Sequence, residues 1–188
     1  MMRRKDREMS KEFAHTLIDH STYGVLSVID KEGNPYGLPL SIVCQGEKLY
    51  FHSAKGGKKV EAFEDGKQVC VTFVGKTKIP ELFSEEELQG FLKDESKGAT
   101  LSSKVFTTEY ESAMVFGKIH LVTDQPEAIE ALRLICQKYT PSKMEYFDLA
   151  IKSGLSRTNI YRVDIEEITA KRKKFAPSGE ELKWGKLE

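Results

Sequence analysis

The chain has 188 residues, of which 39% are hydrophobic and 31% charged, and this composition indicates a globular domain with a sizeable core. Its 29 basic and 29 acidic side chains give a formal net charge of zero, which excludes a whole-molecule field for nucleic acid. Any anion must therefore be recognised locally.

Three widely spaced cysteines, Cys44, Cys70 and Cys136, form no C-x-x-C pair, so we expect buried, reduced thiols and no disulfide framework or metal site. Residues 1–13 lack the apolar core of a signal peptide. No uncharged apolar run approaches the roughly 18 residues of a membrane helix. The sequence therefore predicts a cytoplasmic protein with no membrane partner.

The first half of the chain predicts one helix followed by strands. Ser10 is a suitable N-cap, and apolar residues recur at helical spacing from there to about His20. Strands are predicted from alternating or β-branched patterns over 22–30, 35–45, 49–54 and 68–74. A short helix over 58–66 would end at Gly66. Strands joined by short turns predict an antiparallel meander, which commonly closes as a barrel.

Residues 76–104 interrupt this strand pattern. Ser84 and Glu87 have the spacing of a capping box, so a helix is predicted over 84–93. A long connection of this kind is either a functional lid or a mobile surface loop, and the sequence leaves both open.

The strand pattern resumes over 111–124, where Gly117 indicates a bend or bulge. Asp124 is a suitable cap for a helix that runs to Pro141. The other expected elements are a short helix over 142–154, a last strand over 159–173 and a loosely held tail over 175–188. We therefore expect one domain over 1–175, with 76–104 inserted, and a tail over 176–188.

The stretch "YFHSAKGGKK", residues 50–59, is the candidate binding segment. It leads from a strand through Gly56 and Gly57, which let backbone approach a ligand, to Lys58 and Lys59. Lysines beside open N–H groups suit a phosphate. Because the stretch matches neither a Walker loop nor a dinucleotide fingerprint, a solvated, lysine-rich hairpin end remains an equal alternative.

The succession "LPLSIV", "LYFHSAKGGKKVEAFEDGKQVCVTFVG" and "TTEYESAMVFGKIHLV" resembles the flavin-binding split-barrel superfamily of pyridoxamine 5′-phosphate oxidase. It is most similar to the branch of 5-nitroimidazole resistance proteins, and the resemblance covers residues 2 to about 174 except the insertion. It implies a mainly β domain with flanking helices. More specifically, it implies a six-stranded antiparallel split barrel that forms a homodimer and holds FMN at the subunit interface.

The resemblance also implies roles for individual residues. Lys58 and Lys59 would grip the FMN phosphate, with Ser53 and Ala54 beside them. His52 would donate a proton, orient a substrate or only contact the flavin. The strand along the isoalloxazine ring would be Pro39, Leu40, Ser41 and Ile42. The partner subunit would contribute Glu111 and Ser112.

The implied function is an FMN-dependent oxidoreductase that passes electrons from a small-molecule donor to a nitroimidazole or other nitroaromatic acceptor. The alternatives are a non-catalytic flavin protein (carrier, store or redox sensor), a barrel that binds haem or a deazaflavin, and a barrel without a cofactor. Residues 177–188 do not resemble the oxidase's C-terminal block, so oxidation of vitamin B6 is not expected. The basic run "AKRKK", residues 170–174, is interpreted as a solvated strand end, and no nucleic-acid partner is expected.

Overall fold

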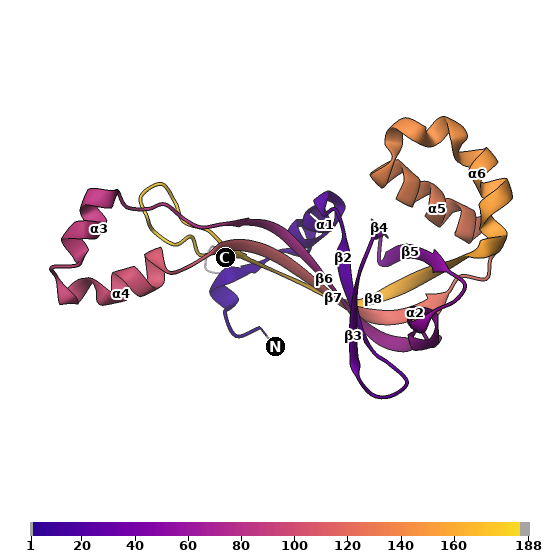
Figure 1. Ribbon diagram of the computed structural model, residues 1–188, viewed down its shortest axis with the longest axis horizontal. Coiled ribbons are helices and arrows are strands. Elements are labelled where there is room, and N and C mark those ends of the chain that lie inside the picture. The colour runs from indigo at the N-terminus through magenta and orange to yellow at the C-terminus, as the bar shows by residue number, and fades with distance from the viewer. Residues whose placement is uncertain (1, 185–188) are drawn as a thin grey trace.

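The structure is a computed structural model that describes residues 2–184. A long antiparallel sheet forms its body, and helices flank the sheet (Figure 1). The strands are β1 (Glu8–Met9), β2 (Gly24–Ile29), β3 (Pro35–Leu40), β4 (Val43–Gln45), β5 (Lys48–Ala54), β6 (Lys67–Lys78), β7 (Glu109–Leu121) and β8 (Thr158–Lys173). The helices are α1 (Lys11–His20), α2 (Lys58–Ala62), α3 (Glu85–Phe91), α4 (Gly98–Thr100), α5 (Gln125–Tyr139) and α6 (Phe147–Gly154).

Every strand pairing is antiparallel, so the expected mainly β domain with flanking helices is confirmed. The strand order is β3-β2-β6-β7-β8-β5-β4, with β1 paired to β8. In the expected meander, β5 would lie between β4 and β6. In the structure it lies between β4 and the distant β8. The sheet has eight strands where six were expected. No pairing joins β3 to β4 within residues 2–184, so closure as a six-stranded split barrel stays a prediction.

The expected strand over 35–45 is broken at Ser41 and Ile42 into β3 and β4. Helix α5 satisfies the backbone at the break. The Ile42 amide donates to the Tyr139 hydroxyl at 3.0 Å, and that hydroxyl donates to the Ile42 carbonyl at 2.9 Å. Lys138 donates to the same carbonyl at 3.0 Å. A side chain from 97 positions away therefore replaces the ladder bonds that a continuous strand would have made.

The hydrophobic core lies in two clusters on either side of β5. Phe51 points into the main cluster, where it stacks on Tyr161 at 5.3 Å and meets Phe63 edge-on at 5.6 Å. Tyr50 points the opposite way, into a second cluster beneath α5 and α6. Alternation along the strand explains this division, since successive side chains face opposite sides. Helix α1 begins after Ser10, whose hydroxyl accepts from the Phe13 amide as predicted, and it covers the main cluster.

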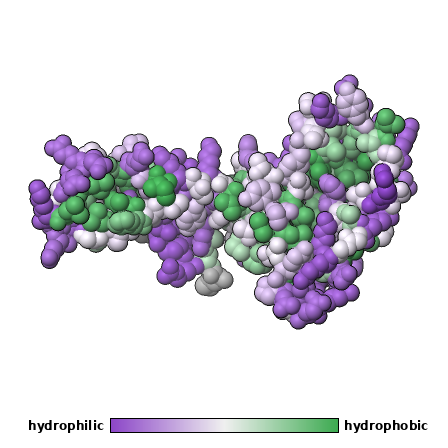
Figure 2. Space-filling view, viewed as in Figure 1, coloured by the Kyte–Doolittle hydropathy of each residue, from purple (hydrophilic) through white to green (hydrophobic). Residues whose placement is uncertain are grey.

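The segment between β6 and β7 projects from the body as an arm, which we define as residues 79–108 (Figure 1). Strand β6 extends to Lys78, past the expected end at residue 74. The predicted capping box of α3 is confirmed, with reciprocal bonds between Ser84 and Glu87. None of residues 81–108 is buried. Figure 2 shows apolar side chains on the surface of the arm, where Leu92 and Phe106 are 75% and 80% exposed.

The predicted irregularity at Gly117 is confirmed as a register shift between Phe116 and Gly117 in the pairing with β8. A Cβ at this position would lie 2.1 Å from the Asp164 carbonyl oxygen. Only glycine therefore allows the two backbones to approach so closely.

The C-terminal segment is not loosely held over its described part, in contrast to the expectation. The Arg7 guanidinium lies 2.6 Å from Glu181, and the Lys183 ammonium lies 2.8 Å from Asp6. The Trp184 amide donates to the Asp6 carbonyl at 3.1 Å. Ion pairs with the N-terminal residues therefore hold a segment that has little apolar patterning.

The cysteines are free thiols, as expected, but all three are half-buried and not buried. No group of three or more potential metal ligands occurs among residues 2–184. Within the same range, no helix is both long enough and apolar enough to span a membrane.

Candidate functional site

The candidate site is built on the junction between β5 and α2. Strand β5 pairs with β8 as far as Ala54, and three residues then lead to Lys58 at the start of α2. Gly57 has a φ of 101°, a left-handed conformation that glycine adopts without strain. A Cβ built at Gly56 or Gly57 would meet nothing within 4 Å. The backbone of this turn is therefore open to a ligand, as predicted.

The two lysines after this turn have different surroundings. The Lys58 ammonium lies 2.9 Å from Oδ2 of Asp30 and 5.2 Å from the centre of the Tyr36 ring. The Asp30 side chain is only 2% exposed. Within residues 2–184, Lys59 makes no ion pair. Of these two lysines, Lys59 is thus the one that a ligand can meet directly, whereas Lys58 is already engaged.

Asp30 closes the turn between β2 and β3 in addition to pairing with Lys58. Its Oδ1 accepts from the amides of Asn34 at 2.8 Å and Glu32 at 3.1 Å. The hydrogen bond from Lys58, followed by that from the Asn34 amide, lowers the pKa of Asp30 to about 2. The same pair raises the pKa of Lys58. Asp30 is therefore ionised at neutral pH and holds Lys58 at the edge of the site.

His52 lies on the exposed face of β5 and makes no hydrogen bond or ion pair in the described part of the chain. Partial burial, followed by the charge of Lys59, lowers its pKa. The imidazole is therefore neutral at neutral pH. The next residue, Ser53, is buried, and its hydroxyl donates to the Ala54 carbonyl at 2.8 Å. Of these two polar side chains, only His52 is accessible.

The predicted ring-binding segment, Pro39 to Ile42, continues from the place where Lys58 is held. Tyr36, under the Lys58 ammonium, is the second residue of β3, which ends at Leu40 just before Ser41. Five residues of strand correspond to roughly 17 Å. Pro39 and Ser41 are exposed, whereas Ile42 is buried and bonded to Tyr139. Lys58 and this segment therefore lie at opposite ends of the surface along β3.

Glu111 and Ser112 do not reach this surface in the same chain. On β8, Ser112 is opposite Lys171, whereas Ser53 is opposite Asn159. These partners are twelve positions apart, which is about 40 Å of strand. Glu111 instead pairs with Arg172 at 3.2 Å. The two halves of the predicted site are therefore separated along the length of the molecule.

Sequence reasoning missed Asp30, Tyr36 and Tyr139. Asp30 precedes a "KEGN" turn, and its residue type indicated only that turn. Its pairing with Lys58 joins residues 28 positions apart, and no periodicity reports such a contact. Tyr139 lies in the helix predicted to run to Pro141, and that prediction did not indicate that its hydroxyl binds the Ile42 backbone.

Comparisons with known proteins concern the family and the fold of the chain. The sequence profile of the family described as pyridoxamine 5′-phosphate oxidase matches residues 10–81 and 75–172. No curated protein matches the chain by sequence. Among solved structures, a candidate 5-nitroimidazole antibiotic resistance protein from Bacteroides thetaiotaomicron is 24% identical, with a TM-score of 0.64 over 88% of this chain and 86% of that chain.

Two further structures have similar folds. The FAD and heme binding protein from Mycobacterium smegmatis is 16% identical, with a TM-score of 0.67 over 88% of this chain and 73% of that one. A flavocytochrome from Azotobacter vinelandii is 17% identical, with a TM-score of 0.69 over 94% of this chain and 73% of that one. At these identities the likeness is one of fold.

Proposed function

This chain belongs to the pyridoxamine 5′-phosphate oxidase family, and we propose that it is an FMN-dependent oxidoreductase. In this proposal a homodimer of split barrels binds FMN at its interface. Electrons pass from a small-molecule donor, such as a nicotinamide cofactor, to a nitroaromatic acceptor. A cytoplasmic location, expected from the sequence, stays a prediction.

The observation that carries the proposal is the open turn at Gly56 and Gly57 beside the unpaired Lys59. A phosphate monoester needs cationic groups and N–H donors, and this turn offers Lys59 and the open backbone at Gly56 and Gly57. One cationic turn suits the single phosphate of FMN. The names of two similar structures, an FAD and heme binding protein and a flavocytochrome, support a flavin in general.

Some residues of the chain would bind FMN, and others would orient the flavin ring or the acceptor. Lys59 would contact the phosphate directly, and Lys58 would join it by turning away from Asp30. The bonds from Tyr139 and Lys138 would hold the Ile42 backbone as a rigid edge for the ring. Bound FMN would supply the hydride and single-electron chemistry. The neutral imidazole of His52 would then offer one N–H to orient an acceptor or to give it a proton.

The separation of Glu111 and Ser112 from the lysines supports the homodimer. If they contact flavin, a second subunit must bring them to it. Ser112 lies on the outer face of the sheet, next to Met114 and Val74, which are 39% and 54% exposed. Exposed apolar residues beside a site are typical of an interface. Static light scattering at micromolar concentration should give twice the mass of one chain, and a monomer would contradict this part of the proposal.

The proposed phosphate contact is tested by FMN binding to single variants. Lys59→Ala removes a charge-assisted contact worth roughly 1.5–3 kcal/mol, so FMN affinity should fall by about 10- to 150-fold. Lys58→Ala should weaken binding less, because Lys58 must first leave Asp30. Lys143→Ala, an exposed lysine outside the site, is the control. Unchanged affinity in the Lys58→Ala, Lys59→Ala double variant would overturn the site.

A non-catalytic flavin protein (a carrier, store or redox sensor) is the second candidate function. It is favoured by one observation: nothing in residues 2–184 bonds to His52, so its imidazole is not held for proton transfer. Anaerobic mixing of the FMN-loaded protein with a nicotinamide donor and a nitroaromatic compound separates the two functions. Multiple turnovers support the oxidoreductase, and FMN binding without turnover supports the carrier.

A further inference from the structure

A cavity of about 770 Å³ lies between helices α5 and α6 and the start of β8. Its apolar walls are aliphatic side chains, namely Val122, Ala128, Ile129, Ile151, Leu155 and Ile160. Hydroxyl, amide and charged groups, among them those of Gln125, Ser156 and Lys152, complete the lining. Cavities of roughly 300–1,000 Å³ with mostly apolar walls and a few polar groups are typical of small-molecule sites. This cavity therefore suits a compound with an apolar body.

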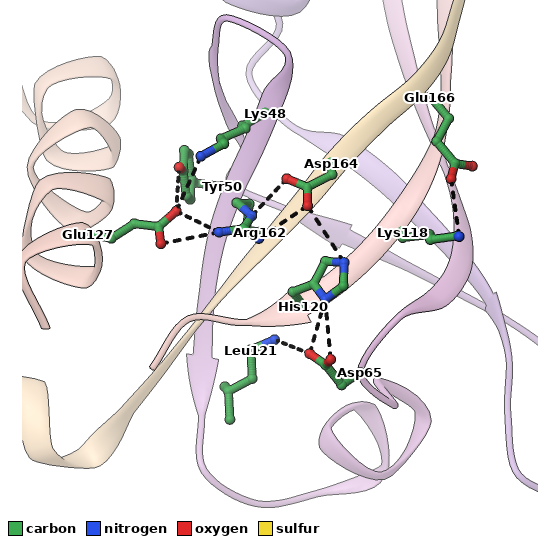
Figure 3. Close-up of polar contacts among 10 residues, drawn as sticks. All are labelled: Lys48, Tyr50, Asp65, Lys118, His120, Leu121, Glu127, Arg162, Asp164 and Glu166. Carbon is green, nitrogen blue, oxygen red and sulfur yellow. Dashed lines mark hydrogen bonds and ion pairs between the residues drawn. The ribbon is translucent and has the colours of Figure 1, made fainter. Parts of the chain in front are cut away.

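The two helices that enclose the cavity are attached to the rest of the domain by specific contacts. On α5, the Glu127 carboxylate accepts from the Tyr50 hydroxyl at 2.8 Å and pairs with Arg162 at 3.0 Å, which fastens the helix to β5 and β8 (Figure 3). The Arg133 guanidinium of α5 lies 4.3 Å from the centre of the Phe147 ring, at the start of α6. The cavity is therefore part of the folded domain.

His52 lies beside one wall of the cavity. In the pairing of β5 with β8, His52 is directly opposite Ile160. Side chains of directly opposite residues point to the same face of a sheet, with Cβ atoms roughly 4.5–5.5 Å apart. Tyr50, two positions before His52, points to this same side and packs in the cluster beneath α5 and α6. The accessible imidazole and the apolar cavity are therefore neighbours.

The proposed ring-binding edge lies on the other side of His52. Strand β4 pairs with β5 so that Val43 is opposite Tyr50, and extending this register by two residues places Ser41 opposite His52. Neighbouring strands are about 4.8 Å apart, so Ser41 and Ile160 are separated by roughly 10 Å. The ring-binding edge, His52 and the cavity thus follow one another across the sheet. A compound anchored in the cavity would have its other end between His52 and this edge.

The charges around the cavity restrict the ligand further. Asp148 is paired with Arg133 at 3.4 Å, whereas Lys152 makes no ion pair within residues 2–184. An unpaired cation attracts anionic or electron-rich groups and repels a second cation. The cavity therefore favours compounds without a positive charge.

We propose that this cavity is the acceptor site: it takes an apolar substituent or second ring of an uncharged or anionic nitroaromatic compound, and the nitro-bearing ring lies beside His52. This inference rests on the proposed function, because it names the class of acceptor used by that site. It predicts a preference for acceptors with an apolar extension over a single small ring. Occupation of the cavity does not require FMN, so binding and turnover are measured separately.

Binding is tested first on the ligand-free full chain, with nitrobenzene and 4-butylnitrobenzene as probes and methyl NMR as the readout. Methyl signals of Ile129, Ile151 and Ile160 and the ring signals of His52 should shift, whereas those of Ile79, in the arm, should not. Each methylene that enters the cavity should tighten binding by up to about fourfold. Equal affinity for the two probes, or shifts in the cavity without any at His52, would overturn the proposal. A second subunit that fills the cavity would leave its methyl signals unchanged, which would also overturn it.

The cavity is then filled by substitution. Ile151→Trp should lower the affinity for 4-butylnitrobenzene to that for nitrobenzene, because the indole occupies the space of the butyl chain. Leu149→Trp, on the exposed face of the same helix, is the matched control and should bind as wild type does. Because a larger side chain can disturb packing, Ile151→Ala is the second variant, and it should shift the preference toward 4-hexylnitrobenzene. Wild-type affinities in both Ile151 variants would show that the probes bind elsewhere.

The expected charge preference is tested with 4-(4-nitrophenyl)butyrate and 4-(4-nitrophenyl)butylamine. The cationic compound should bind about two- to fivefold more weakly than the anionic one, the size expected for an exposed charge pair. Lys152→Met should remove this difference, and Lys143→Met, an exposed lysine that does not line the cavity, should keep it. Equal binding of the two compounds by wild type would overturn the charge preference.

The two proposals fail differently. If 4-butylnitrobenzene shifts the cavity methyl signals but the FMN-loaded protein never reduces it, the proposed function fails while the cavity stands as a site for apolar aromatic compounds. If the loaded protein reduces nitrobenzene and 4-butylnitrobenzene with equal kcat/KM, and Ile151→Trp changes neither value, the oxidoreductase stands and the cavity is not its acceptor site.

Discussion

The arm is joined to the body of the molecule by two strands, β6 and β7, yet the two regions differ in how much of their apolar surface they bury. In the body, β6 and β7 contribute Val71, Phe73 and Val115 to the main cluster, each fully buried. Strand β6 ends at Lys78 and β7 begins at Glu109. Between them, none of residues 81–108 in the arm is buried. Apolar residues in the body stabilise the fold, whereas those in the arm, such as Phe106, face solvent.

This difference indicates that the arm is not needed for the fold of one chain. An aromatic pair, Phe83 and Phe91 at 5.0 Å, and the capping box of α3 organise it locally. A segment that keeps its own structure and exposes apolar side chains is suited to contact something outside the chain. If the body folds without help from the arm, substitutions in the body should lower stability and those in the arm should not.

Removing an aromatic side chain from the core should cause the largest loss of stability. Phe51→Ala deletes a fully buried ring that packs on Tyr161 and Phe63, and it should lower the free energy of unfolding by about 3–5 kcal/mol. The matched variant in the arm, Phe106→Ala, should change it by less than about 0.5 kcal/mol. Urea denaturation of both variants measures the contrast. Similar losses would show that the arm is part of the cooperative unit.

A smaller but clear effect is expected at the bulge in the body. Gly117→Ala places a methyl group against the Asp164 carbonyl oxygen, so the β7–β8 ladder must shift, at a cost of about 1–3 kcal/mol. The control in the arm is Gly98→Ala, where a methyl group meets nothing within 4 Å. Thermal unfolding should give a lower Tm for Gly117→Ala only, and an unchanged Tm for it would contradict the close approach of the two strands.

The Lys58–Asp30 pair should contribute stability that depends on pH. Because pairing lowers the pKa of Asp30 from 3.8 to about 2, its stabilisation is complete above about pH 4 and is lost as pH falls toward 2. Lys58→Met should therefore be less stable than wild type at pH 7, and the difference should disappear near pH 2. Lys31→Met, in the adjacent turn, is the control. A difference that persists at pH 2 would show that charge pairing is not its cause.

Replacing most of the arm should have the smallest effect on the single chain. A variant in which a short Gly/Ser linker replaces residues 81–106 should keep the wild-type free energy of unfolding within about 0.5 kcal/mol. Its light-scattering mass shows whether the arm contributes to the proposed dimer. Loss of cooperative unfolding in this variant would break the distinction between body and arm.

Local patterns in the sequence were sufficient to predict most elements. The cap at Ser10, the capping box at Ser84, the cap at Asp124 and the irregularity at Gly117 all depend on neighbours within a few positions, and each is confirmed. The open turn at Gly56 and Gly57 was predicted for the same reason. Such features are set by backbone geometry that the residue type reports directly.

Long-range partners were not accessible to the same reasoning. The pairing of β5 with β8 joins His52 to Ile160, and the break in the strand at Ile42 depends on Tyr139. The sequence predicted that Lys58 and Lys59 would act as an equivalent pair, whereas in the structure Lys58 is paired with Asp30. In each case the deciding contact lies tens of residues away, and single-sequence periodicity carries no information about it.

The hydrogen bond from the Trp184 amide to the Asp6 carbonyl also has a topological consequence. It brings residues 6 and 184 to one place, close in sequence to β1, which pairs with the end of β8. A chain in which residues 6 and 184 adjoin can be relinked there and opened elsewhere without changing its strand pairings. The arm, in which none of residues 81–108 is buried, is the natural point for new ends. A circular permutant that starts within it should therefore retain the sheet and both of its hydrophobic clusters.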